Sequence, residues 1–455
     1  MQAAGTPRRI GIIGGGIAGL TAAYRLARAG HSVTLWEAHH RFGGQAAAFD
    51  IGDERFMEYF YHHLFMSDRA IVDLAEEIGL GDALMWVDSN NGFFADGRIY
   101  PLNGATDLIK LGFIPLHDRI RIGLVTLYLQ RITTKTRRWM KFEEVTAWEW
   151  LRKAVGTRAF ERVWGAQLRA KFGPRAGEIA MVWFWNKIFL RTQSRPGLLA
   201  KEQLGYFRGS FNTIIDGITN AARDAGATLH HSTGVQALEV LSESSEGRIA
   251  VQTASGSEYF DAVIATTPSP ILARLVPQLP DDYKQQLTSA VYQGALCTLL
   301  ELDQPLSSTY WLNIGDERLP FTGIIEHTNF IGPEHYGGSH LLYISKYLDH
   351  DHPWLKLSDD ELIDLYTPML QLVNPNFSQA WIRNRWVFRE RAAQPIIGLH
   401  YSTRIPSRRT PIDGLYLANT SQIYPEDRGT NYSVVLGNDI ATMVMDDLNA
   451  LPTTD

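Results

Sequence analysis

The feature that most restricts the fold of this chain is a glycine-rich turn close to residue 14. Gly14, Gly16 and Gly19 have the spacing GxGxxG. The turn follows an apolar stretch over 9–13 and precedes an Ala- and Leu-rich stretch over 17–29, which predict a strand and a helix. The order strand, glycine turn, helix is typical of the first unit of a parallel sheet that binds a dinucleotide.

Each glycine of this turn has its own physical role. Gly14 permits the tight turn, Gly16 lets the backbone approach a pyrophosphate because it has no Cβ, and Gly19 lets the helix pack closely on the strand. At the helix N-terminus, Ile17 and Ala18 are expected to present main-chain N–H groups to the phosphates. The sequence therefore predicts a phosphate site at this turn.

An acidic residue follows the second expected strand, over 31–37. Glu37 lies 18 residues past the last glycine of the turn, where a carboxylate accepts hydrogen bonds from both hydroxyls of an adenosine ribose. The same charge repels a 2′-phosphate, so NADP is disfavoured here. Glu37 and the adjacent Ala38 are therefore predicted to bind the adenosine half of a dinucleotide.

A second glycine pair comes shortly after this acid. Arg41, Gly43 and Gly44 form the pattern RxGG, and Gln45 follows. With these motifs the chain resembles the flavoprotein family of amine oxidases, protoporphyrinogen oxidases and carotenoid desaturases. The resemblance implies that FAD is the cofactor and that the arginine and the glycine amides form a second part of its pyrophosphate site. The family pattern usually ends in a further arginine, so Gln45 leaves one positive charge fewer near the phosphates.

A strand–loop–helix unit near the other end of the chain completes the resemblance. Residues 414–418 predict a strand and residues 430–448 predict a helix. The resemblance places Asn419, in the position of a family aspartate, at the ribityl or phosphate portion of FAD. A helix N-terminus beside the flavin stabilises negative charge there. The backbone N–H groups expected at that position are those of Gly429, Thr430 and Asn431.

Three side chains are candidates for catalysis. His62 lies in a segment, 58–63, that resembles the stretch passing beside the isoalloxazine. Stacking on the ring or handling a proton is one interpretation, and polar aromatic packing is the other. Tyr424 and Arg428 belong to the loop before the last helix. Tyr424 or Tyr432 would line the substrate side. Arg428 would pair with Glu426 or Asp427, or it would face an anionic substrate.

The resemblance also implies that the FAD-binding domain is discontinuous. Its expected pieces are 1–68, 200–275 and 405–455. Val235 is expected to contact the adenine ring through its backbone. Two insertions, a mainly helical one over 69–199 and a mixed strand and helix one over 276–404, would form the substrate domain. The predicted fold class is α/β, a Rossmann-like FAD-binding domain with an inserted mixed α+β substrate domain.

These features predict an FAD-dependent oxidoreductase of the amine oxidase type. An organic substrate, which is an amine, a porphyrinogen-like or a polyprenyl-like molecule, would transfer a hydride to flavin N5, and oxygen, a quinone or another acceptor would take the electrons. One alternative is a flavin-dependent isomerase of the UDP-galactopyranose mutase type. Its nucleotide-sugar site would need arginines in the inserted domain, and Arg383, Arg385, Arg389 and Arg391 are candidates because they share one face if the segment is a strand. A solvated face is the favoured interpretation of this row. The other alternative is a flavin-binding protein without turnover.

The composition excludes several other classes. The formal net charge is −6, which gives no overall attraction to nucleic acid. The single cysteine, Cys297, excludes an internal disulfide and a multi-cysteine metal site, and it predicts a reducing, cytoplasmic location. His350 and His352, flanked by Asp349 and Asp351, lack a third ligand at a suitable spacing, so no metal is expected.

Residues 118–141 combine apolar and basic side chains along an expected helix. A surface that contacts a membrane has this composition. A helix that packs on the core with a solvated basic face has it as well, and this second interpretation is favoured because such helices are common on globular proteins. The sequence leaves the oligomeric state open.

Overall fold

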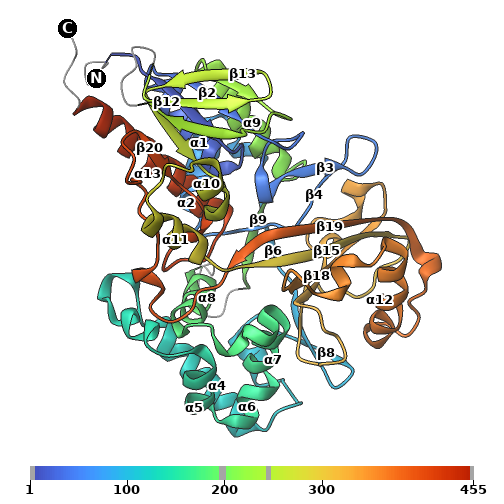
Figure 1. Ribbon diagram of the computed structural model, residues 1–455. Helices are drawn as coiled ribbons and strands as arrows, with labels where there is room; N and C mark the ends of the chain where they lie inside the picture. The colour runs from blue at the N-terminus through green and yellow to red at the C-terminus, as the bar shows by residue number, and fades with distance from the viewer. Residues whose placement is uncertain (1–5, 194–200, 242–246, 451–455) are drawn as a thin grey trace.

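A computed structural model describes residues 6–193, 201–241 and 247–450 of the chain. Figure 1 shows three regions stacked along the molecule. A parallel sheet with its helices lies at the top, a larger sheet crosses the middle, and a group of helices forms the bottom. The expected domain pieces include residues 1–5, 194–200, 242–246 and 451–455, and these lie outside the described residues.

The upper region is built on a five-stranded sheet in which every pair is parallel, in the order β10-β2-β1-β14-β20. Its strands are β1 (Arg9–Ile13), β2 (Ser32–Trp36), β10 (Thr228–His230), β14 (Ala262–Ala265) and β20 (Leu415–Leu417). The strand order changes direction at β1, which has β2 on one side and β14 on the other. In such sheets, ligands bind at the carboxyl ends of the strands beside this point.

Helices α1 (Ile17–Arg28), α9 (Phe211–Asp224) and α13 (Thr430–Asn449) accompany this sheet. Helices α1 and α13 approach each other closely at Gly437. A Cβ on this glycine would lie 2.6 Å from the Ala18 carbonyl oxygen and 2.7 Å from the Thr21 Cβ. The absence of a side chain at this position therefore sets the distance between the first helix and the last one.

Smaller elements connect the upper region to the middle of the molecule. The antiparallel strands β11 (Ala237–Val240), β12 (Ile249–Thr253) and β13 (Gly256–Phe260) form one sheet. The strands β3 (Ala48–Asp50) and β4 (Phe56–Glu58) form a pair, and β5 (Leu64–Phe65), β9 (Gln203–Phe207) and β6 (Leu84–Asp88) form a third small sheet. The helices α2 (Arg69–Glu77), α10 (Ser269–Leu275) and α11 (Asp281–Ser289) also belong here.

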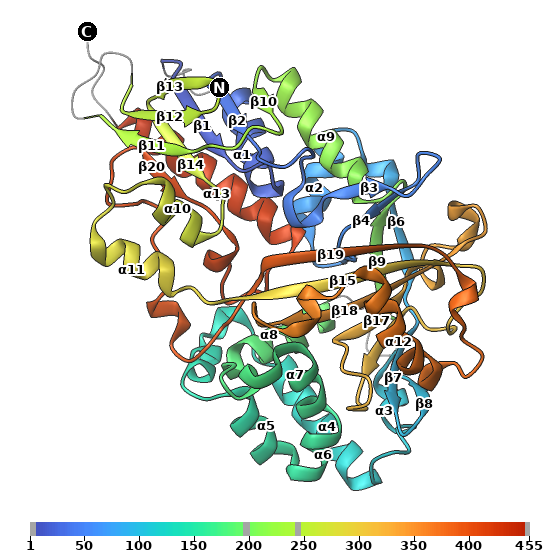
Figure 2. The ribbon, with the colours of Figure 1, turned by 45° about the vertical axis from the view of Figure 1, so that its right-hand side comes forward.

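A seven-stranded mixed sheet occupies the middle, in the order β19-β15-β18-β17-β16-β7-β8. Its strands are β7 (Asn91–Ala95), β8 (Arg98–Pro101), β15 (Tyr292–Leu302), β16 (Trp311–Ile314), β17 (Gly323–Glu326), β18 (His340–Leu348) and β19 (Ile382–Pro395). Every residue of β15 is buried, and Figure 2 shows this strand crossing the molecule between β19 and β18. Helix α12 (Asp359–Val373) lies at one end of this sheet.

The strands β7 and β8 belong to the segment 69–199, which was expected to be mainly helical. Because they pair within the sheet that 276–404 builds, we propose that the two insertions form one substrate domain.

The bottom of the molecule is the helical layer, which consists of α3 (Ala105–Leu108), α4 (Leu116–Gln130), α5 (Ala147–Val155), α6 (Thr157–Arg162), α7 (Trp164–Phe172) and α8 (Met181–Gln193). Thr146 caps α5 as the sequence indicates, because its hydroxyl accepts a hydrogen bond from the Glu149 backbone N–H at 3.2 Å. Among the described residues, no helix combines the length and the apolar character that crossing a bilayer requires.

The close approach of α1 and α13 generates a first prediction. Gly437→Ala should lower the free energy of unfolding by about 1–3 kcal/mol, the usual cost of overpacking, although alanine favours a helix more than glycine does. Gly177→Ala is the control, because a Cβ there meets no atom within 4 Å. Urea unfolding of both variants measures the difference. Equal stability of the two variants would contradict this account of the α1–α13 contact.

Candidate active site

The predicted phosphate turn lies where β1, β2 and β14 end. The Gly14 N–H donates to the Trp36 carbonyl oxygen at 2.8 Å. The Thr266 hydroxyl donates to the carbonyl oxygens of Ile13 and Gly14 at 3.0 and 3.1 Å. Gly14 has a φ of 107°, which glycine adopts without strain. A Cβ at Gly19 would lie 2.0 Å from the Gly14 oxygen, so the close packing of helix on turn requires glycine.

The second glycine pair runs beside this turn. The Gly43 N–H donates to the Gly15 carbonyl oxygen at 2.8 Å, and Gly16 pairs with Gly43 in a parallel bridge. The nearest atom to a Cβ built on Gly16 is the Gly44 Cα at 3.9 Å. Within the described part of the chain, no side chain caps the N-terminus of α1. Two side-chain-free stretches therefore flank an uncapped helix N-terminus, an arrangement that fits a pyrophosphate such as that of FAD.

The predicted adenosine residues are brought together at the neighbouring strand end. The Glu37 carboxylate accepts hydrogen bonds from the backbone N–H groups of Gly15 at 2.7 Å and His39 at 2.8 Å. The Thr233 N–H donates to the Glu37 carbonyl oxygen at 2.8 Å, so the loop that leads to Val235 lies beside the acid. A Cβ on the intervening glycine of this loop would lie 3.6 Å from the exposed Ala38.

Arg41 and Gln45 differ in their surroundings. The Arg41 guanidinium lies 5.5 Å from the centre of the Phe56 ring, at the edge of the glycine pair. Gln45 points toward the C-terminal loop. Its side-chain amide donates to the Ala392 carbonyl oxygen at 2.8 Å, and its oxygen accepts from Arg428 Nη1 at 3.4 Å. The departure from the family arginine therefore places a neutral residue against Arg428.

Arg428 links three separate parts of the chain. Its Nη2 donates to the Tyr347 hydroxyl at 2.7 Å, and its Nε donates to Gln394 Oε1 at 3.2 Å. Together with Gln45, these contacts join the glycine segment, β18 and β19. The expected ion pair with a neighbouring acid is not the arrangement found, because Asp427 is directed toward other partners.

Asp427 is the buried anion of the site and is 7% exposed. It forms an ion pair with Lys187 of α8, and it accepts hydrogen bonds from Trp183 Nε1 at 3.2 Å and Gln394 Nε2 at 3.4 Å. Burial acts to raise the pKa of Asp427, but the charges of Lys187, Lys171 and Arg428 outweigh it and hold this pKa well below its usual range. Asp427 is therefore ionised at neutral pH.

Lys171 of α7 is a site residue that the sequence did not reveal. Its ammonium lies 4.9 Å from the centre of the Trp183 ring and 5.0 Å from that of Tyr347. Burial and the positive charges of Lys187 and Arg428 lower the pKa of Lys171 to about 7. No local motif marks Lys171 or Lys187, because each lies on a different helix and only the packing of α7 and α8 brings them to the C-terminal loop.

His62 lies beside a buried network around Glu58, because its ring is 5.4 Å from that of Phe211. The Glu58 carboxylate accepts hydrogen bonds from the Tyr206 hydroxyl at 2.9 Å and from the Phe211 N–H, at the start of α9, at 2.7 Å. Burial raises the pKa of Glu58 to about 7. His62 Nδ1 lies 2.5 Å from the Phe60 carbonyl oxygen, and burial lowers the pKa of His62 to about 4. His62 is therefore neutral at pH 7.

Tyr424 and Asn419 are engaged within the protein. The Tyr424 hydroxyl donates to Glu143, and its ring lies 5.5 Å from that of Tyr401, so the side chain is directed toward the helical layer. Asn419 donates to the Thr267 carbonyl oxygen at 2.8 Å and also bonds Ser269 and Ser421. These four bonds use the capacity of its amide, so the expected contact with ribityl hydroxyls requires one of them to break.

The start of α13 keeps its main-chain donors uncapped. Gly429 is its N-cap residue and provides no side chain, and a Cβ built there meets no described atom within 4 Å. Thr430 and Asn431 are buried, and Asn431 Oδ1 accepts a hydrogen bond from the Ile71 N–H at 3.2 Å. The backbone of this turn is therefore anchored to α2 while open space adjoins Gly429.

The arginine row on β19 does not form an open anion site. Arg383 pairs with Asp303, and Arg385 pairs with Asp360. Arg389 Nη2 donates to the Leu357 carbonyl oxygen at 2.8 Å and lies near an acid of α12. These pairs hold α12 and a turn against the sheet. Arg391 is exposed on the same strand.

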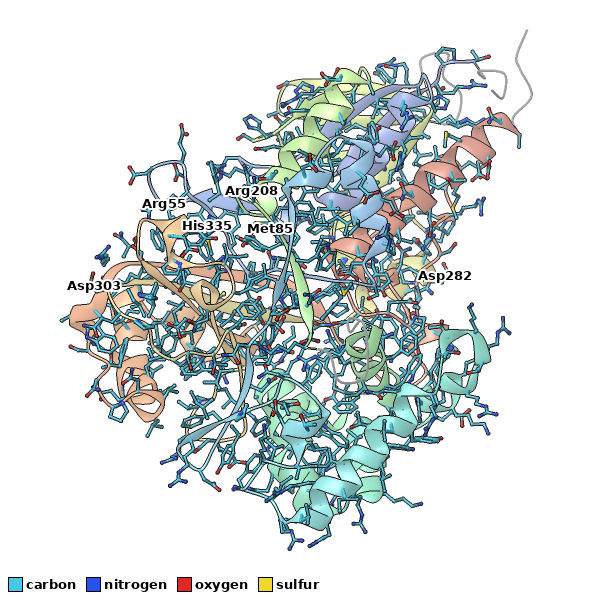
Figure 3. The ribbon with its side chains drawn as sticks, turned by 180° about the vertical axis from the view of Figure 1, so that it is seen from behind. Arg55, Met85, Arg208, Asp282, Asp303 and His335 are labelled. Carbon is cyan, nitrogen blue, oxygen red and sulfur yellow. The ribbon has the colours of Figure 1, made fainter. Side chains whose placement is uncertain are left out.

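A cavity of about 120 Å³ lies apart from these residues, where Figure 3 shows Arg55, Met85, Arg208 and His335 close together. The Arg55 guanidinium already donates to the carbonyl oxygens of Gly52 at 2.9 Å and of the neighbouring Tyr336 at 2.7 Å. The Arg55 guanidinium therefore stabilises the backbone around the cavity. Among the described residues, no group of three His, Cys, Asp or Glu side chains could hold a metal ion.

The chain matches the sequence profile of the family described as flavin containing amine oxidoreductase over residues 17–426. The chain belongs to this family, and it is an FAD-dependent oxidoreductase. This confirms the predicted cofactor, the enzyme class and the fold class. The roles of the individual site residues and the cytoplasmic location stay predictions.

Individual relatives extend the similarity over nearly the whole chain. A 15-cis-phytoene desaturase of an Oncidium hybrid cultivar is 24% identical over 449 residues, covering 92% of this chain and 75% of that protein. Among solved structures, cyclohexylamine oxidase of Brevibacterium oxydans has a TM-score of 0.70 at 14% identity, covering 98% of this chain and 100% of that one. A reduced UDP-galactopyranose mutase has a TM-score of 0.71 at 16% identity, covering 96% of each chain. At 14% and 16% identity, these two similarities to solved structures show a shared fold.

The facing glycines generate a second prediction. Gly16→Val should abolish retention of FAD, because its side chain would enter the space between the two glycine segments. The flavin absorbance of the purified protein measures the occupancy. Gly177→Val, at an exposed position with no neighbouring atom, should purify with its flavin. A yellow Gly16→Val protein would show that the pyrophosphate lies elsewhere.

The contacts of Glu37 generate a third prediction. Glu37→Gln should weaken FAD binding by about 1.5–3 kcal/mol, the value of a hydrogen bond to a charged group, which corresponds to about a tenfold to hundredfold loss of affinity. An amide has one acceptor oxygen, so it cannot accept from both Gly15 and His39. Titration of apoprotein with FAD measures the constant. An unchanged affinity would contradict the ribose assignment.

Proposed function

We propose that this enzyme dehydrogenates a neutral or anionic, largely apolar substrate of the polyprenyl type, and that cationic amines are not its substrates. The observation that carries the proposal is the charge around Asp427. Lys187 and Arg428 are two cations beside this one carboxylate, and Lys171 adds a third positive charge when it is protonated. The cluster therefore carries an excess of positive charge in either state of Lys171. An ammonium substrate would be repelled there.

The aromatic surroundings of this cluster support the same substrate class. Trp183 and Tyr347 flank the Lys171 ammonium, and Tyr61 packs on Trp311 with ring centres 4.9 Å apart. Such surfaces bind apolar chains through contact area. The similarity to phytoene desaturases over 92% of the chain also supports a polyprenyl-like substrate.

The dehydrogenation removes a hydride and a proton from the substrate. FAD, held by the glycine turn and Glu37, would supply the hydride acceptor, and oxygen, a quinone or another acceptor would take the two electrons. Lys171 Nζ is the group suited to hold the proton, because its pKa of about 7 leaves much of it neutral at physiological pH. Arg428 donates to the hydroxyl of Tyr347, whose ring centre lies 5.0 Å from this amine.

Anaerobic bleaching of the flavin tests the substrate class. The holoenzyme should be bleached by phytoene and left oxidised by putrescine and cyclohexylamine. Bleaching by the amines without bleaching by phytoene would contradict the proposal. Turnover of a nucleotide sugar only after reduction with dithionite would favour the isomerase instead.

The titration of Lys171 generates a fourth prediction. The rate of substrate-driven bleaching should rise with pH up to about 7, because the neutral amine is the proton acceptor, and it should fall about tenfold per unit at lower pH. Lys171→Met should lose this limb of the pH profile while FAD stays bound. Lys284→Met changes a half-buried lysine of α11 that pairs with Asp281, and this control should keep the profile. The same pH dependence in Lys171→Met would exclude this role.

A further inference from the structure

The exposed apolar side chains of the protein are concentrated in one place. Among the described residues ten large apolar side chains are exposed, and seven of these lie between residues 109 and 140. Five of them form one strip on α4, which we name the α4 face: Leu116, Ile120, Leu124, Leu127 and Tyr128. Scattered apolar side chains are normal on a surface, but a contiguous strip marks an interaction site.

The spacing of these residues explains why they share a face. Leu116, Ile120, Leu124 and Tyr128 follow one another at steps of four residues, and Leu127 lies three residues after Leu124. Steps of three and four keep side chains on the same side of an α-helix. The opposite side of α4 carries Ile122 and Leu129, which are buried against the helical layer. Helix α4 therefore has two apolar sides, and the core covers one of them. The favoured interpretation of 118–141, a core-packed helix with a solvated basic face, is corrected on this point, because the outer side of α4 carries the apolar strip.

The charge of this segment has the opposite sign to that of the whole chain. Residues 109–141 contain eight Lys and Arg residues and one acid, whereas the chain carries −6. The acid, Asp118, is buried and accepts a hydrogen bond from Arg158 at 2.7 Å. Several cations near the C-terminal end of α4 are exposed and have no acidic partner among the described residues: Arg131, Lys135, Arg137, Arg138 and Lys141.

An aromatic pair borders the strip. Tyr128 stacks on Trp150 of α5 with ring centres 6.2 Å apart. Tyr and Trp side chains favour the boundary between water and hydrocarbon, because they combine a large apolar ring with a polar group. In Figure 1 helix α4 lies near the bottom of the molecule, at the opposite end from the parallel sheet.

We propose that the α4 face docks the protein on an anionic lipid surface, with α4 lying in the plane of the interface. The apolar strip would enter the boundary of the acyl chains, and the unpaired cations would meet the lipid phosphates. A second copy of the chain is a less suitable partner for the α4 face. A symmetric contact would bring the same basic patch of both copies together, and like charges would oppose it.

The position of α4 also links this surface to the site. Trp185 of α8 donates its Nε1–H to the carbonyl oxygens of Leu129 and Ile132, at 3.2 and 3.1 Å. Helix α8 also carries Trp183 and Lys187, which contact Asp427. Helix α8 therefore contacts α4 on one side and the charged cluster on the other.

Sedimentation of the holoenzyme with vesicles tests this proposal. The protein should sediment with vesicles of equimolar phosphatidylcholine and phosphatidylglycerol, and much less with pure phosphatidylcholine or at high salt. The double change Ile120→Glu and Leu124→Glu should lower the partition coefficient at least tenfold. Val291→Glu is the control, because Val291 is an exposed apolar residue outside α4, and this variant should bind as the parent does.

Two further measurements separate the outcomes. The flavin absorbance and the melting temperature of each variant should match the parent, which shows that lost binding is not lost folding. Analytical ultracentrifugation should give the same mass for the parent and the double variant. A parent protein that stays in the supernatant with anionic vesicles would overturn the proposal. A parent dimer that the double change dissociates, without binding to vesicles, would overturn it in favour of a second copy.

Discussion

The contact between two glycine segments at the carboxyl edge of the parallel sheet is the constraint on which the rest of the site depends. The Gly43 N–H reaches the Gly15 oxygen, and Gly16 faces Gly44 with no side chain between them. Backbones approach this closely only where Cβ atoms are absent. The contact fixes where the following Gln45 lies, and Gln45 in turn meets Arg428. The C-terminal loop is thereby positioned against the first turn of the chain.

Arg428 connects the glycine segments to the middle sheet. Its bonds to Tyr347 and Gln394 attach the loop to β18 and β19. The loop then brings Asp427 to the helical layer, where it pairs with Lys187. All three regions of the molecule therefore meet at two consecutive residues. The buried carboxylate is compensated by several cations, and the surplus positive charge is the basis of our proposal that the substrate is not a cationic amine.

The helical layer contributes residues both to the site and to the outer surface of the protein. On its inner side α7 and α8 supply Lys171 and Lys187 to the site. On its outer side α4 presents an apolar strip with basic residues near it. A helix with two apolar sides must leave one of them outside the core unless a partner covers it. The same layer thus connects the chemistry of the enzyme to the surface that we propose meets a lipid interface.

The sequence by itself determined the local units of this protein. The glycine turn, α1, Glu37 and the final strand–loop–helix unit could be predicted, because turn chemistry, helix capping and short-range periodicity act over a few residues. Only the tertiary structure decided which distant side chains meet. It placed Lys171 beside Arg428, turned Tyr424 toward Glu143, enclosed Asn419 in its own hydrogen bonds and left one side of α4 outside the core. The physical reason is that a helical period identifies an apolar side, whereas the packing of whole layers decides what covers it and which charges are buried together.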